Sequence, residues 1–205
     1  MQALLFEVTP RDRHEDHYFR HAGMLRPILM EQDGLIFIER FKSLTRPKVI
    51  LSHSLWRDEA SIARWRTERH HHTSQTAGRF EHFEDYRIRI SHVLSHIAPD
   101  QPSRSWPHDG AYSDAAATPD RFLTIIRVKS KPDSATREVF QSVTEPDSYL
   151  LINTAPTEAE SRTQIEHAQT NPSVISALMG RVSRDYGMFE RAEAPQYFAD
   201  VVRPA

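Results

Sequence analysis

The chain has 205 residues, a formal net charge of -2 at neutral pH and no cysteine. A charge so close to zero gives no bulk electrostatic reason to expect binding to nucleic acid or to an anionic membrane. The absence of cysteine excludes disulfides, thiolate nucleophiles and cysteine-ligated metals, and it fits a cytoplasmic protein. No run of about 18 apolar residues occurs and the N-terminus lacks the pattern of a secretory signal, so we expect no membrane association and no secretion.

The first half of the chain carries strand and helix patterns in turn. Alternating apolar residues predict strands, and apolar residues at helical spacing predict helices. Asp33-Gly34 and Gly78 are typical stops for two helices, and Pro27 is expected to kink the first. The expected elements are strand, helix, strand, strand, helix and strand, at residues 3–8, 14–32, 35–41, 49–56, 58–78 and 86–90. This is the ferredoxin-like order, which leaves one face of the sheet without helices.

The second half repeats part of this pattern. The sequence F-K-S-L-T-R-P at residues 41–47 recurs as F-Q-S-V-T-E-P at residues 140–146, and two further short matches follow in the same order. Such spacing indicates a duplicated unit, although too few residues separate its first two strands to hold a helix. Its expected elements are strands at 121–130, 137–144 and 149–154, a helix at 157–169 and a strand at 177–189.

Three regions follow from this repeat. We expect a ferredoxin-like repeat over residues 1–97, a linker rich in Pro, Ser, Ala and Asp over 98–119, and a degenerate second repeat with a C-terminal tail over 120–205. Each sheet has one uncovered face, so the two repeats are expected to pack together as one α+β barrel, a pseudo-dimer within a single chain. Residues 184–198 are expected to cover a sheet edge or, as the alternative, to close one end of the barrel as a lid.

The stretch around the second predicted helix carries a family resemblance. W-R-D-E-A at residues 56–60 is followed by W-R at 65–66, then by histidines, a glutamine, Gly-Arg and D-Y-R-I-R-I. In spacing and composition this stretch resembles the antibiotic biosynthesis monooxygenase family. The resemblance implies an α+β fold in which two ferredoxin-like units pack sheet against sheet as a dimeric barrel.

The resemblance also implies an activity. Oxygenases of this family need neither metal nor flavin, because an electron-rich phenolic substrate loses a proton and then reacts with dioxygen. Such a site must supply a dry apolar cavity, a group that takes the phenolic proton and donors that hold the oxyanion. We therefore expect a cofactor-independent monooxygenase that acts on a small aromatic or polycyclic substrate with dioxygen, either as a monomeric pseudo-dimer or as a homodimer.

Five residues are candidates for this chemistry. They are Trp65, His71, His72, Gln75 and His53. Trp65 and His72 are expected to share one helix face, and His71 best matches the family's histidine after the tryptophan. The competing interpretations are a core role for Trp65 and a solvated helix end for the histidines. Arg87 and Arg89 would add positive charge if their face of the last strand lined the cavity.

Two other functions stay open. A haem-degrading branch of the same family uses an asparagine on the first strand and a histidine on the second helix, whereas these positions hold Glu7 and Gln75 here. The expected cofactor is therefore none, with haem as the alternative. A non-catalytic ligand-binding module that has kept the barrel without the chemistry is the third possibility.

The remaining motifs carry less information. His14, His17 and His21 lie at helical spacings that can place two imidazoles on one metal ion, but no H-E-x-x-H arrangement accompanies them. A solvated face of the first helix is the expectation for these histidines. No phosphate loop, nucleophile elbow or dinucleotide fingerprint occurs, so kinase, hydrolase and dehydrogenase functions have no support.

Overall fold

The computed structural model describes residues 1–98, 101–105, 122–133 and 138–202. The elements of the first half are β1 (Gln2–Pro10), α1 (Glu15–Met30), β2 (Leu35–Ser43), β3 (Ile50–Trp56), α2 (Glu59–Thr67), α3 (Arg69–Ala77), the π-helical turn η1 (Gly78–His82) and β4 (Phe83–Ala98). Those of the second half are β5 (Gln101–Ser105), β6 (Phe122–Val128), β7 (Glu138–Ser142), β8 (Tyr149–Ala155), α4 (Glu158–Gln169) and β9 (Val174–Gly187). The predicted strand and helix order is confirmed apart from the division of the second helix into α2 and α3 and the additional strand β5.

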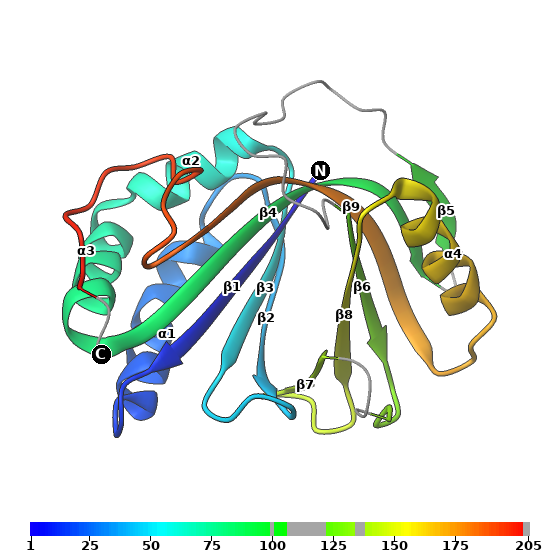
Figure 1. Cartoon of the computed structure of the whole chain (residues 1–205), viewed down its shortest axis with the longest axis horizontal. Coiled ribbons are helices and arrows are strands. Elements are labelled where there is room, and N and C mark those ends of the chain that lie inside the picture. The colour runs from blue at the N-terminus through cyan, green and yellow to red at the C-terminus, as the bar shows by residue number, and fades with distance from the viewer. Residues whose placement is uncertain (99–100, 106–121, 134–137, 203–205) are drawn as a thin grey trace.

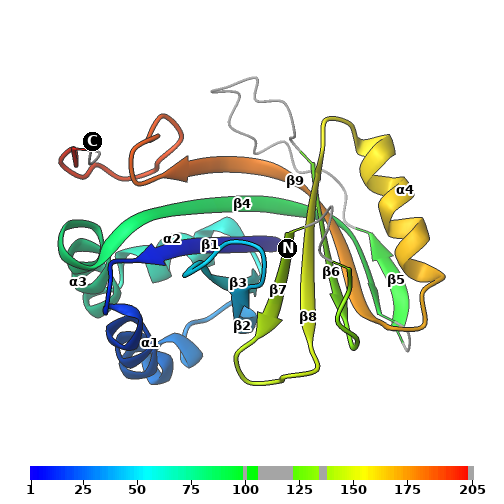
Figure 2. The ribbon, with the colours of Figure 1, turned by 60° about the horizontal axis from the view of Figure 1, so that its bottom comes forward.

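The strands form one sheet that closes on itself. Its order is β1-β3-β2-β7-β8-β6-β9-β4-β5, and an additional β1–β4 pairing closes the ring. The halves join where β2 pairs with β7 and where the long strands β4 and β9 run side by side (Figure 2). The expected α+β barrel within one chain is confirmed, because each repeat supplies the strands that cover the open face of the other.

The two repeats share a turn as well as an order of elements. After β2, the Ser43 hydroxyl accepts a hydrogen bond from the backbone N–H of Arg46 at 2.9 Å. After β7, the Ser142 hydroxyl accepts the matching bond from Glu145, also at 2.9 Å. A serine that caps its own turn in this way is typical of tight strand connections. The repeated F-x-S-x-T-x-P sequence therefore encodes the same turn twice.

The barrel interior is filled by apolar side chains from both repeats. Strand alternation sends Ala3 and Leu5 inward from β1, whereas Leu4 and Phe6 point to the helix side. The buried residues of the interior cluster are Ala3, Leu5, Phe41, Val49, Leu51, Leu55, Val93, Leu123, Ile125, Phe140, Leu150, Ile152, Leu178 and Val182. This core replaces the subunit interface that two separate ferredoxin-like proteins would need.

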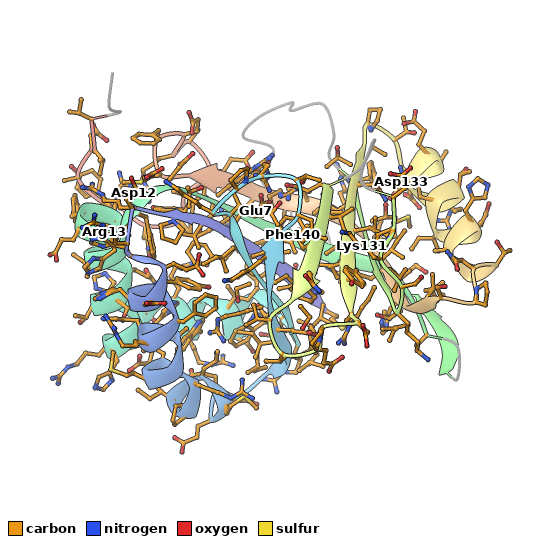
Figure 3. The ribbon with its side chains drawn as sticks, turned by 90° about the horizontal axis from the view of Figure 1, so that it is seen from below. Glu7, Asp12, Arg13, Lys131, Asp133 and Phe140 are labelled. Carbon is orange, nitrogen blue, oxygen red and sulfur yellow. The ribbon has the colours of Figure 1, made fainter. Side chains whose placement is uncertain are left out.

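A buried ion pair lies beside this core. Glu7 and Arg89 are 4% and 3% exposed and bind each other, and Arg46 joins Glu7 to Glu138 of the second repeat. Figure 3 shows Glu7 and Phe140, one from each repeat, in the middle of the molecule between its two ends. Burial by itself would raise the pKa of the Glu7 carboxyl, but the charge of Arg89 and the hydrogen bonds from Arg46 and Arg89 outweigh it and lower that pKa.

The helices cover the outer face of the sheet at both ends of the molecule. Figure 1 shows α1, α2 and α3 together at one end and α4 at the other. The α4 helix packs tightly through Ile165 and Ala168 on apolar residues of β6, β8 and β9. None of the described helices combines the length and apolar character needed to span a bilayer.

Two predictions about local structure were wrong. The single helix expected over residues 58–78 is divided at Glu68, whose extended backbone (ψ 132°) ends α2, while its carboxylate accepts a hydrogen bond from the N–H of His71 and caps α3. A side-chain cap makes a new helix start there, so the helical register changes at this point. The linker expected over residues 98–119 contains β5, which pairs with β4; its other residues beyond Ala98 lie outside the described part of the chain.

Candidate active site

A cavity of about 200 Å³ lies between α1, α2 and α3 and the helix-facing side of the first repeat's strands. The strand register builds its floor. Arg40, Ser52, Phe6, Ile88 and Tyr186 stand side by side on β2, β3, β1, β4 and β9. These side chains share one face of the sheet because paired residues of neighbouring strands point the same way. The floor therefore has an arginine at its β2 end and a tyrosine at its β9 end.

The rest of the lining is mostly apolar. The next row across the sheet holds Ile38, Ser54, Leu4 and Ile90, and α1 and α2 add Leu25, Leu29, Ile62 and Trp65. Ser54 accepts a hydrogen bond from the indole N–H of Trp56 at 2.9 Å, so its hydroxyl is already engaged. Cavities of this kind, apolar with a few fixed polar groups, are typical of small-molecule sites.

Trp65 and His71 form the wall on the α2–α3 side. The two rings are stacked, with centroids 4.0 Å apart and 12° between their planes. The Nδ1 atom of His71 lies 2.8 Å from the backbone oxygen of Trp65. Nε2 of Gln75 also lies 3.0 Å from this Nδ1 atom, but it has another acceptor in the backbone oxygen of Arg66, whereas the Trp65 carbonyl can only accept. We therefore assign the proton to Nδ1 and the lone pair to Nε2 of the imidazole. Burial lowers the pKa of His71 to about 4, so the ring is neutral at physiological pH and Nε2 is an acceptor.

Gln75 connects this wall to the C-terminal tail. Its side-chain amide donates to the backbone oxygen of Arg66 at 3.1 Å, and its Oε1 accepts a hydrogen bond from Gln196 at 2.8 Å. Gln196 and Phe198 of the tail line the cavity together with Gln75. The tail is thus part of the site and not only a neighbour of it.

Arg79 fixes the tail in this position. Its guanidinium, 1% exposed, donates to the backbone oxygens of Met188 at 2.6 Å and Ala199 at 3.1 Å. The tail places Phe198 over His72, with ring centroids 5.8 Å apart. The edge-cover expectation for residues 184–198 is therefore incomplete, because this segment closes one side of the helix-covered cavity.

A cluster of four histidines lies at the α1 end of the cavity. The ring centroids of His17 and His21 of α1 are 4.2 Å apart, and the ring of His82 of η1 lies 3.8 Å from that of His17. The Nδ1 atoms of His14 and His82 are 3.0 Å apart. Burial lowers the pKa of His17, and the charge of neighbouring His82 and His21 lowers it further. Among the described residues no three His, Asp or Glu side chains have an arrangement that would hold a metal ion.

This cluster corrects one expectation. His17, His21 and His82 line the cavity, so the histidine face of α1 is not simply solvated. The α1 spacing alone showed three of the four residues, and only the turn before β4 brings His82 to them.

The comparisons with known proteins agree with this architecture. Residues 1–77 match the family model described as antibiotic biosynthesis monooxygenase. A protein of Pyricularia oryzae (strain 70-15) named jasmonate monooxygenase ABM is 31% identical, over 97% of this chain and 98% of its own length. The chain belongs to the antibiotic biosynthesis monooxygenase family. Among solved structures, an aldoxime dehydratase has a TM-score of 0.53 over 89% of this chain and 81% of that chain at 9% identity, which is evidence of a shared fold alone. An anthrone oxidase-like protein covers 95% of this chain and 96% of its own, with 10% identity and a TM-score of 0.39.

For this monooxygenase-family chain, the structure brings three of the five candidate residues together. Trp65, His71 and Gln75 line the cavity. His72 is exposed, contacts Phe198 and is absent from the lining, because the break at Glu68 turns His71 and not His72 toward Trp65. The predicted shared face of Trp65 and His72 was therefore wrong, while the chemical roles of these residues stay predictions.

The fifth candidate, His53, lies on the opposite side of the sheet. It points into the barrel interior with Leu51 and Leu55, and its ring meets the edge of Phe37 at 5.5 Å. Arg87 and Arg89 also face away from the cavity, since Arg87 binds Asp185 and Arg89 binds Glu7. Strand alternation placed these residues on a common face, but the sequence did not show which face holds the cavity.

Several lining residues were not singled out from the sequence. Tyr18, Arg40, Ser52 and Arg66 contribute polar groups to the cavity, as does Tyr186, which lies in the segment predicted to cover a sheet edge or form a lid. Arg40 alone carried a signal, because it follows Ile36 and Ile38 on one face of the predicted strand as a charged residue. The others required the register of the strands and the packing of α1 over them.

Proposed function

We propose that this chain is a monooxygenase that adds one atom of dioxygen to a small, mainly apolar molecule bound in the cavity, with no metal or flavin. The observation that carries the proposal is the neutral His71 ring, held against Trp65 with Nε2 as its acceptor atom at an apolar cavity. Membership of the family supports oxygenase chemistry, and the mainly apolar lining of the cavity suits the dry site that this chemistry requires.

In this proposal His71 acts as the proton acceptor. Its Nε2 accepts a strong hydrogen bond from an acidic O–H of the substrate, which favours loss of that proton and formation of an electron-rich anion. The anion then transfers electrons to dioxygen. For an activated CH₂ group the reaction balances as CH₂ + O₂ → C=O + H₂O, so both electron pairs come from the substrate and no external reductant is consumed.

Arg66 supports the anion in this scheme. It lines the cavity beside Trp65, and the part of the chain that the structure describes contains no ion pair for it. Burial raises the pKa of Tyr186 to about 12, and the charge of the nearby Arg66 acts against that rise. A fixed guanidinium next to a developing oxyanion lowers its energy most where water is excluded.

The size of the cavity favours a compact substrate. About 200 Å³ lies below the ~300–1,000 Å³ typical of drug-sized ligand sites. We therefore favour a molecule with one or two rings over a large polycyclic compound. The relative from Pyricularia oryzae is named for jasmonate, which makes jasmonic acid the first compound to test, followed by a set of small polyphenols.

The test is turnover under labelled dioxygen. Purified protein is incubated with each compound under ¹⁸O₂, in the presence and absence of NADH, and the products are analysed by mass spectrometry. The proposal expects one labelled oxygen atom in the product without NADH. Binding without oxidation by any compound would instead support the non-catalytic module, and oxidation that required NADH would overturn the reductant-free reaction.

A haemin titration distinguishes the haem alternative from the cofactor-free proposal. Haemin is added to the purified protein and to His71→Ala while the Soret band is followed. A saturable shift that the variant loses would overturn the cofactor-free proposal in favour of a haem protein. No saturable shift is expected, because His71 lines a cavity smaller than those that take drug-sized ligands.

A further inference from the structure

Arg40 lines the cavity and differs from three arginines near the sheet that bind carboxylates. Arg89 binds Glu7, Arg127 binds Glu39, and Arg46 binds Glu7 and Glu138. Within the described residues Arg40 forms no ion pair, and its Nε atom is buried without a hydrogen-bond partner. A guanidinium stays charged at every accessible pH. Arg40 therefore carries a permanent positive charge that no carboxylate of the described residues neutralises.

The cavity offers nothing to neutralise that charge. Arg40 and Arg66 line it together with His17, His21, His71 and His82, while Asp and Glu are absent from the described lining. An unpaired charge beside apolar surface is costly unless another group supplies the opposite charge and hydrogen bonds. The lining therefore has the electrostatic character of a site for an anion.

Two hydroxyl groups lie next to Arg40. Ser52 is its direct partner across the β2–β3 register, and the described chain shows no hydrogen bond of the Ser52 hydroxyl. Tyr18 of α1 is 8% exposed and lines the same end of the cavity. Burial raises the pKa of the Tyr18 phenol, and the adjacent Arg40 guanidinium acts against that rise, which places the two groups together. Such a guanidinium with neighbouring hydroxyl donors suits the two oxygens of a carboxylate.

This polar group lies away from the Arg66 end. Arg40 and Tyr186 stand at opposite ends of the five-strand row. Arg66 acts on Tyr186, whereas Arg40 acts on Tyr18. The two arginines thus serve different parts of a bound molecule.

We propose that Arg40, with Tyr18 and Ser52, forms a carboxylate-binding subsite, so that the substrate is a small organic acid whose apolar body extends along Phe6 and Leu4 toward Trp65 and His71. This inference rests on the proposed monooxygenase function and identifies the substrate class of the same cavity. The acid group anchors one end of the molecule at β2. Its reacting carbon then lies at the His71 end, where Arg66 meets the developing charge.

Binding measurements test this subsite without requiring turnover. Isothermal calorimetry compares jasmonic acid, decanoic acid and naphthylacetic acid, each paired with its methyl ester, on the wild type, Arg40→Gln and Arg40→Lys. Arg20→Gln on the exposed side of α1 is the matched control. Thermal unfolding of each variant shows that it is folded.

For the tightest acid, Arg40→Gln should raise Kd about 10- to 100-fold and leave the ester within about 3-fold, because only the acid loses a charge-assisted hydrogen bond. The Kd of the acid for Arg40→Lys should lie between those for the wild type and Arg40→Gln, and the Kd for Arg20→Gln should match the wild type. Equal affinity of acid and ester in the wild type, an equal loss for both in Arg40→Gln, or no binding of any acid would overturn the inference. Acids that bind through Arg40 but are not oxidised under ¹⁸O₂ would leave the subsite standing and refute the proposed reaction.

Discussion

His71 is bound twice by the same residue: its ring stacks on the indole of Trp65 at 4.0 Å, and its Nδ1–H donates to the backbone oxygen of Trp65 at 2.8 Å. The stacking fixes the plane of the imidazole, and the hydrogen bond fixes its tautomer. Both contacts exist because α2 ends at Thr67 and α3 begins at Arg69, which returns the chain to the last turn of α2. In a single continuous helix the carbonyl of Trp65 would accept from the N–H of Arg69, whereas here it accepts from the N–H of Glu68 at 3.2 Å and from His71.

Replacing His71 by Ala should lower kcat by about 10²- to 10⁴-fold, the usual contribution of a positioned general base. The wild-type rate should stay level from neutral pH downward and fall only as the pH approaches about 4, where the imidazole becomes protonated and Nε2 no longer accepts. Steady-state kinetics on the oxidised compound measure both effects. His70→Ala is the control, because His70 is exposed and binds Glu68; a His71→Ala enzyme as active as this control would contradict the assignment.

Replacement of Arg79 should release the C-terminal tail from the cavity. Arg79→Met removes the donors to Met188 and Ala199 and should lower the free energy of unfolding by about 3 kcal/mol, since hydrogen bonds from a buried charged group are involved. Limited proteolysis should then cut after β9, and ligand affinity should fall because Gln196 and Phe198 leave the cavity. Arg69→Gln, on the exposed side of α3, should show neither change. Unaltered proteolysis in Arg79→Met would show that other contacts hold the tail.

His53 should limit the acid stability of the protein. Burial lowers its pKa to about 3, and both ring nitrogens lack partners among the described residues. Because the unfolded chain takes up this proton near the ordinary pKa of 6.5, the native state loses stability as the pH falls from about 6.5 toward 3. Between pH 7.5 and 4.5 the loss from this residue is roughly 2.5 kcal/mol.

His53→Leu should remove that loss, since leucine cannot bind a proton and suits the neighbouring Leu51 and Leu55. Urea unfolding at the two pH values measures the difference. The control His167→Gln changes an exposed histidine of α4 and should keep the wild-type pH dependence. If His53→Leu and the wild type lost equal stability on acidification, the barrel histidine would be hydrated or paired in solution.

The secondary structure was largely predictable because its signals are local. The alternation in β1, the apolar spacing in α1 and the repeated Ser43 and Ser142 turns each depend on neighbouring residues. The break at Glu68 was missed because its cause is a carboxylate that caps α3, and a glutamate inside a helical pattern ordinarily favours continuation. The strand β5 was missed because its sequence, Gln101–Ser105, lacks apolar alternation, and its partner β4 is known only from the structure.

The sequence by itself determined that this chain is a duplicated α+β protein with a Trp65–His71 stretch typical of its family, because periodicity and spacing are properties of neighbouring residues. Only the tertiary structure decided which residues share the cavity. A strand residue faces either the barrel or the helices, and nothing in the alternation distinguishes these two apolar sides. The closed barrel buries His53 and Arg89 on one side of the sheet and leaves Arg40 and Ser52 on the other, and long-range pairing brings Tyr186 and the tail to His71.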